Sequence, residues 1–583
     1  MLKKTVILLS FLLLFFSYGY AKTDTEELLK QTQELKSQLN ELQKQMLLLQ
    51  QKLMETQKKL EQTQKQQEMA NKNVETLKTK VAKAYKHAAG DKVRLSISLE
   101  PKFWSIHMDD VYVAPQSMMS LFFKDYNPAN PFAGGLNGAT LPQIQQMFQG
   151  MQQAGMVPKA DKIDVDNDIV RTLKFRLRMD STVNEHLRFA GRMAVYKVWG
   201  DSVGINVNRG GMHDITLDGT ESSNPHGDDV KLERAYFVYH NEFNKIKWHL
   251  SVGRRPSTEG PPFEYRENLP DVGGSPLATI INWEFDGASL GFNLEDLTGI
   301  PGLAFKLCYG SAFDSQYGTT SAFVSQPALD DVDLFGFIAT LYNGWVDPLN
   351  MDLKVMFNYA YAPDISDGFT GLTVMPFNIY KDSEGKYHFE QNTGLFVDRV
   401  EPQTDIGKWQ AASLLVQTNM LDGALDLFLS GSWSHTEAER VSKIPLYQML
   451  GYSLLSSNGK LRDRDGWAFY GGVRYNLMDY GLKLGFEYNY GSKYWFPFTG
   501  AEDNLVASKI ATRGHVFEPY FIKSLINDHF FIKAGAQFYK YDYSGSGNPL
   551  GEPVDVDDIT AMDALFPVIK YMQQYYLSMV YRF

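Results

Sequence analysis

The last nine residues of the chain, "YYLSMVYRF" (575–583), carry an aromatic or apolar side chain at every second position. These residues are Tyr575, Leu577, Met579, Tyr581 and Phe583. A period of two is typical of a β-strand, because successive side chains of a strand point to opposite faces. The mean hydropathy of the whole chain is nevertheless below zero. Such an ending predicts a sheet with one face against an apolar environment.

The first residues predict export from the cytoplasm. Two lysines precede an apolar run from Val6 to Phe16, and the small residues Gly19 and Ala21 suit cleavage after Ala21. This run is shorter than the roughly 20 apolar residues that a membrane-spanning helix needs. We therefore assign residues 1–21 to a signal peptide rather than to an uncleaved anchor.

Charge and cysteine content exclude several classes of function. Removing the signal peptide takes away two of the 57 basic residues and leaves 55 against 68 acidic ones, a formal net charge of −13. That balance argues against a nucleic-acid partner. Cys308 is the single cysteine, so the chain can form neither an internal disulfide nor a thiolate metal cluster.

Residues 22–90 predict a periplasmic coiled coil. The stretch is rich in Gln, Lys, Glu and Leu, and its apolar residues recur at alternating steps of four and three, as a left-handed coiled coil requires. So narrow an apolar stripe needs a partner helix, most simply in a homotrimer of this chain. A spacer or cell-wall contact is the alternative to a plain oligomerisation helix. The seam consists of Leu28, Leu35, Leu39, Leu42, Met46, Leu49, Leu53, Leu60, Val74, Leu77 and Val81.

From Lys92 onward the period changes to two. The stretches "TLKFRLRM" (172–179), "LRFAGRMAV" (187–195), "LKVMFNYAY" (353–361) and "LKLGFEYNY" (482–490) each place apolar side chains on one face. Strands of soluble β-sandwiches also alternate in this way. Segments of about 10 to 13 residues with aromatic edges, however, suit strands that cross a membrane at a tilt.

Short and long connections alternate along this region, as turns and surface loops do in outer-membrane barrels. The short links are 181–185, 241–245, 295–301, 345–350, 420–423, 478–480 and 525–528. Seven hairpins, a first strand near 92–102 and a last strand at 571–583 predict an all-β transmembrane barrel of about 16 antiparallel strands over residues 91–583. Fourteen and eighteen strands stay open, because Pro519 interrupts one strand and the faces of "LERAYFVYH" (232–240) are ambiguous.

The terminal strand also resembles the C-terminal assembly signal of bacterial outer-membrane barrels. In that signal a final aromatic residue and alternating apolar residues form the lipid face of the closing strand and are read by the barrel insertion machinery. The resemblance implies that the barrel lies in the bacterial outer membrane, in contact with its lipid, and that the coiled coil lies in the periplasm.

A barrel of sixteen strands is wide enough for an aqueous channel, and its inward-facing residues decide what passes. The alternation places mainly basic residues inward, with few acids such as Glu487. These basic residues predict a mild preference for anions. Alternatively, the basic residues pair with carboxylates of an inserted loop, and the channel is not selective. The predicted pore-lining residues are Lys174, Arg176, Arg178, Arg188, Arg192, Lys354, Arg474, Lys483 and Lys533.

The first long loop, 103–168, is predicted either to constrict the lumen or to cap the surface. Its acidic run "DVDND" (164–168) is a candidate calcium ligand, although such runs are more often solvated. The sequence motifs of haem attachment, zinc proteases, serine hydrolases and phosphate-binding loops are absent. We therefore expect no enzyme activity, no metal and no cofactor; a hydrolase site at the barrel rim is the enzymatic alternative.

A longer resemblance covers most of residues 92–583. The stretches "LSVGRRPSTEGPPFEYREN" (250–268), "GLTVMPFN" (371–378), "FEYNYGSKYWFPFTGAEDNLVASKIATRG" (486–514) and "YKYDYSGSGNPLG" (539–551) are similar to signatures of a family of porin-like outer-membrane proteins with an N-terminal coiled coil. That family is found chiefly in anaerobic bacteria that respire metals or sulfur. The resemblance implies the architecture, and a cytochrome as a candidate partner.

Two functions of different class follow from these observations. The first is an outer-membrane porin-like channel for passive diffusion of small hydrophilic solutes. The second is a structural envelope protein, whose coiled coil spaces the outer membrane or tethers it to peptidoglycan while the barrel serves as an anchor.

Overall fold

The computed structural model describes residues 67, 93–200, 230–270, 275–311, 319–320, 325–326, 332–373, 377–391, 397–500, 504–506 and 508–583. The chain divides into two compact units, Met1–Asp91 and Lys92–Phe583. The predicted signal peptide and, apart from residue 67, the predicted coiled coil lie outside the described residues, so both stay predictions.

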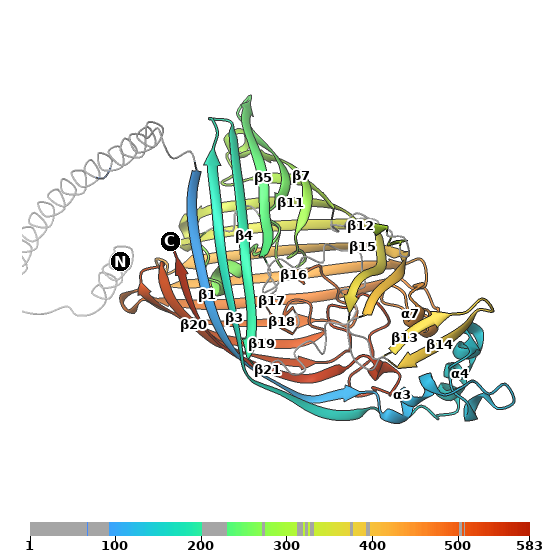
Figure 1. Ribbon diagram of the computed structural model, residues 1–583. Helices are drawn as coiled ribbons and strands as arrows, with labels where there is room; N and C mark the ends of the chain where they lie inside the picture. Colours follow the sequence, from blue (N-terminus) through green and yellow to red (C-terminus); the bar gives the residue numbers. More distant parts are fainter. Residues whose placement is uncertain are drawn as a thin grey trace, which may run out of the picture. The chain divides into compact units, whose positions relative to one another are not determined.

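Sixteen antiparallel strands close into a barrel (Figure 1), which confirms the predicted strand number. Each strand pairs with its neighbours along the chain, and the first pairs with the last. The sixteen are β1 (Val93–Val113), β3 (Asp161–Thr182), β4 (Leu187–Gly200), β5 (Val230–Phe243), β6 (Ile246–Arg255), β7 (Phe285–Asn293), β8 (Ala304–Ser311), β11 (Asp333–Val346), β12 (Met351–Thr373), β15 (Val397–Met420), β16 (Leu425–Ala438), β17 (Arg464–Leu477), β18 (Leu482–Gly491), β19 (Gly514–Ile526), β20 (Phe530–Tyr541) and β21 (Val568–Arg582).

The seven predicted short links all connect adjacent barrel strands. Several depend on residues that accept a left-handed backbone, such as Gly299 (φ 73°), Asn350 (φ 51°) and Gly481 (φ 54°). The links carry the short helices α6 (Glu295–Thr298), η3 (Asp347–Leu349) and η4 (Met478–Tyr480). Turn chemistry therefore helps to set the register of these three hairpins.

Strand β21 shows how the barrel wall separates two environments. Tyr575, Leu577, Met579 and Tyr581 are each 39–43% exposed on the outer face, whereas Ser578 between them is fully buried. Large apolar residues are exposed on the outer faces of other strands as well, including Leu99, Phe103, Leu414, Leu429, Phe469, Leu484, Phe486, Phe517 and Phe538. The outer wall is thus apolar, as lipid contact requires.

The end of the chain closes the barrel. The backbone N–H of Phe583 donates to the carbonyl oxygen of Ile97 at 2.9 Å, and the N–H of Ile97 donates to the carbonyl oxygen of Phe583 at 2.8 Å. Among the described residues, no helix combines the length and the apolar character needed to span a bilayer.

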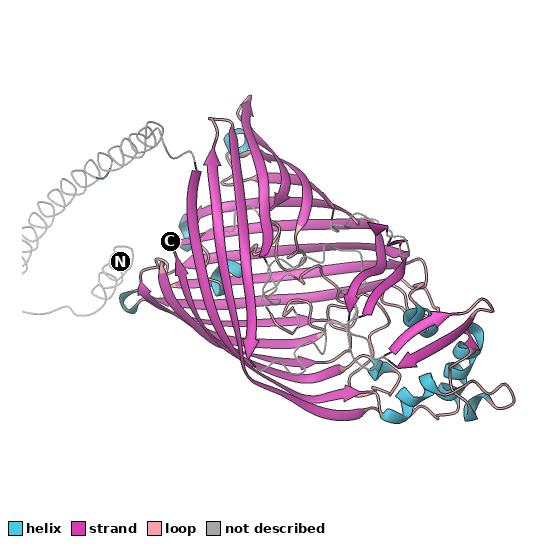
Figure 2. Cartoon of the chain, in the orientation of Figure 1, coloured by secondary structure: helices cyan, strands magenta, loops and turns pink. Residues whose placement is uncertain are grey.

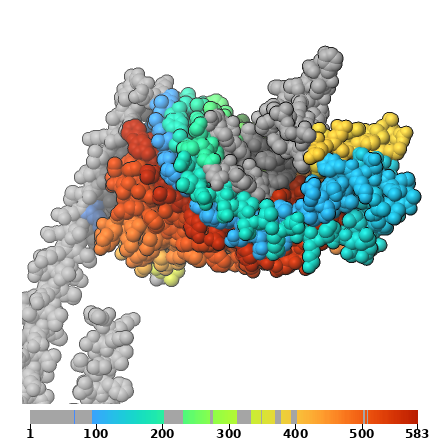
Figure 3. All heavy atoms as spheres, turned by 60° about the horizontal axis from the view of Figure 1, so that its bottom comes forward, coloured from blue at the N-terminus to red at the C-terminus, as the bar shows by residue number. Residues whose placement is uncertain are grey.

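The first long connection forms a cap at one end of the barrel, opposite the C-terminus (Figure 1). It contains α3 (Gln116–Phe123), η1 (Pro131–Ala133), β2 (Ala139–Thr140) and α4 (Leu141–Gln153). Here β2 pairs with the hairpin of β13 (Phe377–Lys381) and β14 (Lys386–Gln391), and the longer helices gather beside that hairpin (Figure 2). Figure 3 shows the two segments in contact.

The cap has an apolar core of its own, which includes Phe122, Phe148, Phe377 and Phe389. The flanking strands are longer than predicted, since β1 continues to Val113 and β3 begins at Asp161. The remaining elements are α5 (Phe263–Arg266), the pair β9 (Thr319–Thr320) and β10 (Ser325–Gln326), α7 (Pro445–Leu450) and η5 (Asp563–Leu565).

Candidate functional site in the barrel lumen

The connection between β6 and β7 enters the barrel and contacts two parts of its wall. We call its described residues, 256–270 and 275–284, the crossing segment. Its helix α5 places acidic, basic and aromatic side chains in different directions within one turn. The contacts of these side chains, described below, reach strands that are far apart around the barrel.

On one side of the lumen, Glu259 binds the basic wall of β3 and β4. Its carboxylate oxygens lie 2.5 Å from Arg176 Nη1 and 2.9 Å from Arg192 Nη1. Glu233 on β5 completes the cluster, since it accepts hydrogen bonds from Arg176 Nη2 at 2.9 Å and from the Tyr196 hydroxyl at 2.8 Å. All of these side chains are buried or nearly so.

On another side of the lumen, the same segment binds strands β15 to β21. Lys533 Nζ lies 2.8 Å from Glu267 Oε2, and Lys483 Nζ donates to Asn268 Oδ1 at 2.6 Å. Gln417 Nε2 donates to Glu264 Oε1 at 2.7 Å, and Arg474 Nη1 donates to the carbonyl oxygen of Tyr265 at 2.8 Å. These contacts anchor the crossing segment at both of its faces.

Neighbouring cations keep two glutamates of the crossing segment ionised. Burial by itself raises the pKa of the Glu259 carboxyl, but Arg176 and Arg192 hold that pKa well below its usual value. The same balance applies to Glu267, where Lys533 and Arg266 outweigh the effect of burial. Both carboxylates therefore neutralise basic charge of the wall at neutral pH.

A second inserted segment, the connection between β18 and β19, packs beside the first. Lys509 within it is 1% exposed, and its Nζ lies 2.6 Å from both Glu487 Oε2 on β18 and Glu518 Oε2 on β19. The two segments also bind each other, because the N–H of Asn282 donates to the carbonyl oxygen of Phe498 at 2.7 Å. Trp495, Phe496 and Phe498 are fully buried.

Several of the predicted pore-lining residues meet the crossing segment directly. Arg176, Arg192, Arg474, Lys483 and Lys533 do so through the contacts given above. Arg176, Arg192 and Lys533 pair with carboxylates of this inserted loop. For these three residues, the alternative interpretation of the basic wall applies.

The other four predicted residues also lie on the wall. The charge of Lys174, opposite Glu100, acts on Glu259, and the charge of Lys354, opposite Gln417, acts on Glu264 of the crossing segment. Arg178 pairs with Asp180 of its own strand, with a side chain that is 50% exposed. Arg188 is exposed on β4.

The acidic run 164–168 belongs to β3. Asp166 lies 2.6 Å from His107 Nδ1, and Asp164 accepts a hydrogen bond from the backbone N–H of Asp110. Among the residues that the structure describes, no group of three or more His, Cys, Asp or Glu side chains is arranged to hold a metal ion.

The acidic half of this site, namely Glu233, Glu259, Glu267 and Glu518, is not predicted from the sequence. Glu233 lies at a β-bulge, where the pairing of β4 with β5 shifts between Arg192 and Met193. The bulge breaks the alternation of faces, which explains the ambiguity of "LERAYFVYH". Glu259 and Glu267 belong to "PSTEGPPFEYREN" (256–268), where no period marks a loop that folds inward.

The sequence of residues 164–583 matches the family described as "Protein of unknown function (DUF3373)". No curated protein sequence matches the chain.

Three similar solved structures are distant. The trimer form of OmpT, an outer membrane protein of Vibrio cholerae, is 11% identical, with 84% of this chain and 99% of that chain covered and a TM-score of 0.33. OprB of Pseudomonas putida is 10% identical, with 85% and 95% covered and a TM-score of 0.38. An anion-selective porin from Comamonas acidovorans is 9% identical, with 84% and 99% covered and a TM-score of 0.34. At this distance none of them bears on solutes or on assembly.

Proposed function

We propose that this chain, which belongs to the DUF3373 family, is a porin-like channel of the outer membrane, because its sixteen strands close around a polar lumen. Small hydrophilic solutes would pass by passive diffusion through the space that the crossing segment leaves. The observation that carries this proposal is a charged lumen inside an apolar wall. A sheet of this size with polar residues inward and apolar residues outward suits lipid outside and water inside.

The crossing segment would act as the constriction. It contacts β3 and β4 through Glu259 and β18, β20 and β21 through Asn268 and Glu267. A segment bound on both faces cannot sway freely, so the remaining passage would have a fixed bore. Fixed charges at such a narrowing act strongly on ions, since water there is scarce.

The ion preference of the channel would be weak. The basic wall alone favours anions, and this preference stays our hypothesis for the cationic residues that face water. Glu259 and Glu267, however, carry negative charge into the same lumen beside Arg176, Arg192 and Lys533. We therefore expect a permeability ratio for chloride over potassium that is only slightly above unity.

Planar-bilayer recording tests this function. The mature protein is purified in detergent, its barrel fold is verified by heat-sensitive migration on a gel, and single-channel current is recorded in a potassium chloride gradient. Stepwise openings with a reversal potential near zero support a porin-like channel. A folded barrel that gives no openings at any voltage contradicts it.

One observation favours a second function, that of a structural envelope protein. Trp495, Phe496, Phe498 and Lys509 of the second inserted segment are almost completely buried, so much of the interior serves packing rather than passage. A barrel filled in this way could serve as an anchor for the predicted coiled coil. Pull-down of peptidoglycan by the full-length protein, combined with silence in the bilayer, would favour this function.

The predicted partners remain proposals. A homotrimer would bring three coiled-coil segments together, and crosslinking in native membranes tests it. A cytochrome beside the barrel, implied by the family resemblance, would be tested by co-purification, since the chain has no haem attachment motif of its own.

A further inference from the structure

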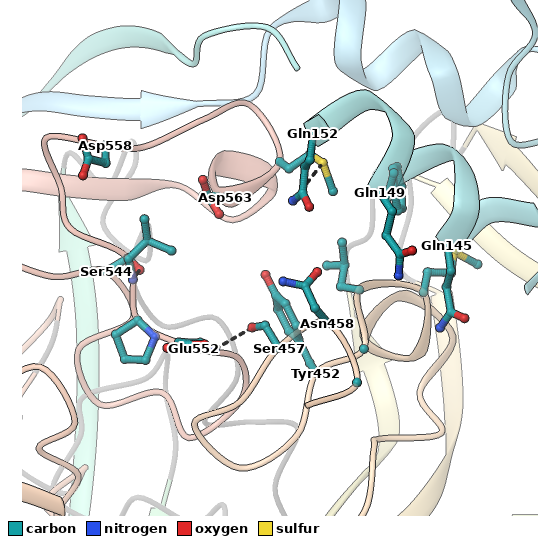
Figure 4. A pocket seen from close by; sticks show the side chains of 18 of the residues that line it. Gln145, Gln149, Gln152, Tyr452, Ser457, Asn458, Ser544, Glu552, Asp558 and Asp563 are labelled. Carbon is teal, nitrogen blue, oxygen red and sulfur yellow. Dashed lines mark hydrogen bonds between the residues drawn. The ribbon is translucent and has the colours of Figure 1, made fainter. Parts of the chain in front are cut away.

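The cap contains a cavity of about 440 Å³ that the channel does not use. Four parts of the chain line it: one face of α4, the end of α7 with the turn that follows it (residues 449–459), Lys493 in the connection between β18 and β19, and the connection between β20 and β21 (residues 544–563). Figure 4 shows this cavity from close by. Its volume falls within the range of roughly 300 to 1,000 Å³ that is usual for small-molecule sites.

Side-chain amides form one edge of the cavity. Gln149 and Gln152 reach into it from α4, and Asn458 approaches from the turn below (Figure 4). Within the part of the chain that the structure describes, the amides of Gln149 and Asn458 have no hydrogen-bond partner. A side-chain amide carries an NH₂ group that donates and an oxygen that accepts. These two residues can therefore donate hydrogen bonds to the hydroxyls of a ligand and accept hydrogen bonds from them.

The opposite edge is acidic. Asp558 and Asp563 lie across the hollow from the amides (Figure 4). One oxygen of Asp563 accepts the hydroxyl of Thr560 at 2.6 Å, which fixes the carboxylate and leaves its second oxygen available. The cation of this pocket, Lys493, is 3.9 Å from Glu552, which also binds Arg464 at 2.8 Å. Acids thus outnumber bases around the hollow, and anionic ligands are disfavoured.

An aromatic ring and apolar side chains form the remaining wall. The ring of Tyr452 lines the cavity and stacks on Tyr447, with centroids 6.0 Å apart. Phe148, Met449 and Met562 lie next to it and belong to the buried core of the cap. This wall is therefore rigid and offers a flat apolar surface to a ligand.

We propose that the cavity is a binding site for a neutral polyhydroxylated solute, namely a short saccharide. The C–H faces of sugar rings pack on aromatic and apolar surfaces, while their hydroxyls donate to carboxylates and exchange hydrogen bonds with amides. Each of these groups lines the cavity. The saccharide could come from the medium or from the sugars of a neighbouring lipopolysaccharide, which present the same chemistry.

The position of α4 supports a preformed site. Gln143 Oε1 accepts hydrogen bonds from the backbone N–H and the hydroxyl of Thr140, which fixes the start of the helix. Ile144, Met147 and Met151 bury the adjoining face of the helix, and Phe148 is buried where the helix borders the cavity. The amides that line the cavity therefore sit on a fixed scaffold, so that binding requires little ordering of the protein.

The test uses the full chain in lauryldimethylamine oxide, a detergent without a sugar headgroup. Maltotriose is titrated in one arm, and lipid-free core oligosaccharide of lipopolysaccharide in the other, with binding followed by saturation-transfer NMR. Binding in either arm supports the inference and identifies the source. The double variant Gln149→Ala/Asn458→Ala should bind about tenfold more weakly, since two hydrogen bonds are lost.

The control variant is Gln146→Ala, an exposed residue of the same helix that does not line the cavity. Its affinity should equal that of the parent protein. The inference is overturned if neither saccharide binds, if the double variant binds as tightly as the parent, or if 1,4-diaminobutane displaces the saccharide and binds more tightly. None of these readouts depends on channel activity, which the double variant should retain.

Discussion

Glu259 joins the loop and the wall of the lumen through a single carboxylate. Its oxygens lie 2.5 Å from Arg176, 2.9 Å from Arg192 and 3.7 Å from Arg234. Glu233 and the fully buried Glu284 add negative charge to the same cluster. Three guanidinium groups in so small a space repel one another unless acids are interposed. The residue is therefore the point at which charge in the lumen is most sensitive to substitution.

Substituting Glu259→Gln should shift the channel toward anions. The change keeps the size of the side chain but removes its charge, so Arg176 and Arg192 act more strongly on permeating ions. We expect the permeability ratio of chloride over potassium to rise roughly twofold, because charged side chains at a constriction set selectivity. Reversal potentials in a salt gradient measure this ratio.

The matched control for this change is Glu384→Gln. Glu384 pairs with Lys386 in the exposed turn between β13 and β14, far along the chain from the lumen cluster. The same ratio in parent, control and Glu259→Gln proteins would contradict the assignment of Glu259 to the constriction.

Lys509 has the opposite role, as a cation enclosed by acids. Its ammonium group is almost fully buried between Glu487 and Glu518. Substitution Lys509→Met should lower the free energy of unfolding by about 3 to 5 kcal/mol, because Glu487 and Glu518 lose the ammonium group that they share, although Glu518 keeps Arg266 at 3.4 Å. Lys493→Met, at a half-buried site 3.9 Å from Glu552, should cost less than about 1 kcal/mol. Urea titration followed by tryptophan fluorescence distinguishes the two.

At the scale of elements, the crossing segment should respond to pH. Burial opposes ionisation of Glu259 and Glu267, but neighbouring cations hold both pKa values well below the usual value. A carboxyl with a lowered pKa in the fold stabilises it at any pH above its unfolded pKa, about 4.3 for glutamate. This stabilisation is lost as the pH falls from there through the pKa of the folded state.

We therefore predict a melting temperature that changes little between pH 7 and about pH 5 and falls steeply below about pH 4. Circular dichroism in detergent measures it. The double variant Glu259→Gln/Glu267→Gln should melt lower at neutral pH and lose part of the acid-dependent decrease, since the buried ion pairs of Glu233 and Glu518 remain. An identical pH profile in the parent and the double variant would show that other carboxyls dominate.

The barrel elements were predictable because their signals are local. A period of two, short turns and the apolar terminal strand together indicate sixteen strands, and the structure has sixteen. Even Pro519 fits, since it pairs with Phe486 on one side while the pairing of β19 with β20 omits its position.

The inserted segments were not predictable in the same way. Glu259 meets Arg176 across 83 positions of the chain, and Lys533 meets Glu267 across 266. No local period marks such contacts, because a loop that folds into a lumen and a loop that extends into solvent have the same composition. Glu233 was missed for another reason, since a single bulge reverses the face on which its side chain lies.

At the scale of the whole molecule, the outer wall should behave as a lipid-facing surface. Leu577 lies in the middle of the terminal strand and is 40% exposed on the outer face, whereas Tyr581 lies near the strand end. Substitution Leu577→Arg should destabilise the barrel in lipid vesicles by about 2 to 4 kcal/mol, and Tyr581→Arg by only about 0 to 1 kcal/mol, since the cost depends on depth. Urea unfolding in vesicles measures both; equal costs would argue against a membrane midplane at Leu577.

The most direct test of the channel is single-channel recording of the parent protein beside a variant in which residues 261–278 are replaced by a short glycine-serine link. The parent should open in steps with a reversal potential near zero. The variant should open in steps of higher conductance, because the constriction is gone. A folded parent and a folded variant that both stay silent would contradict a channel and leave the barrel as an anchor.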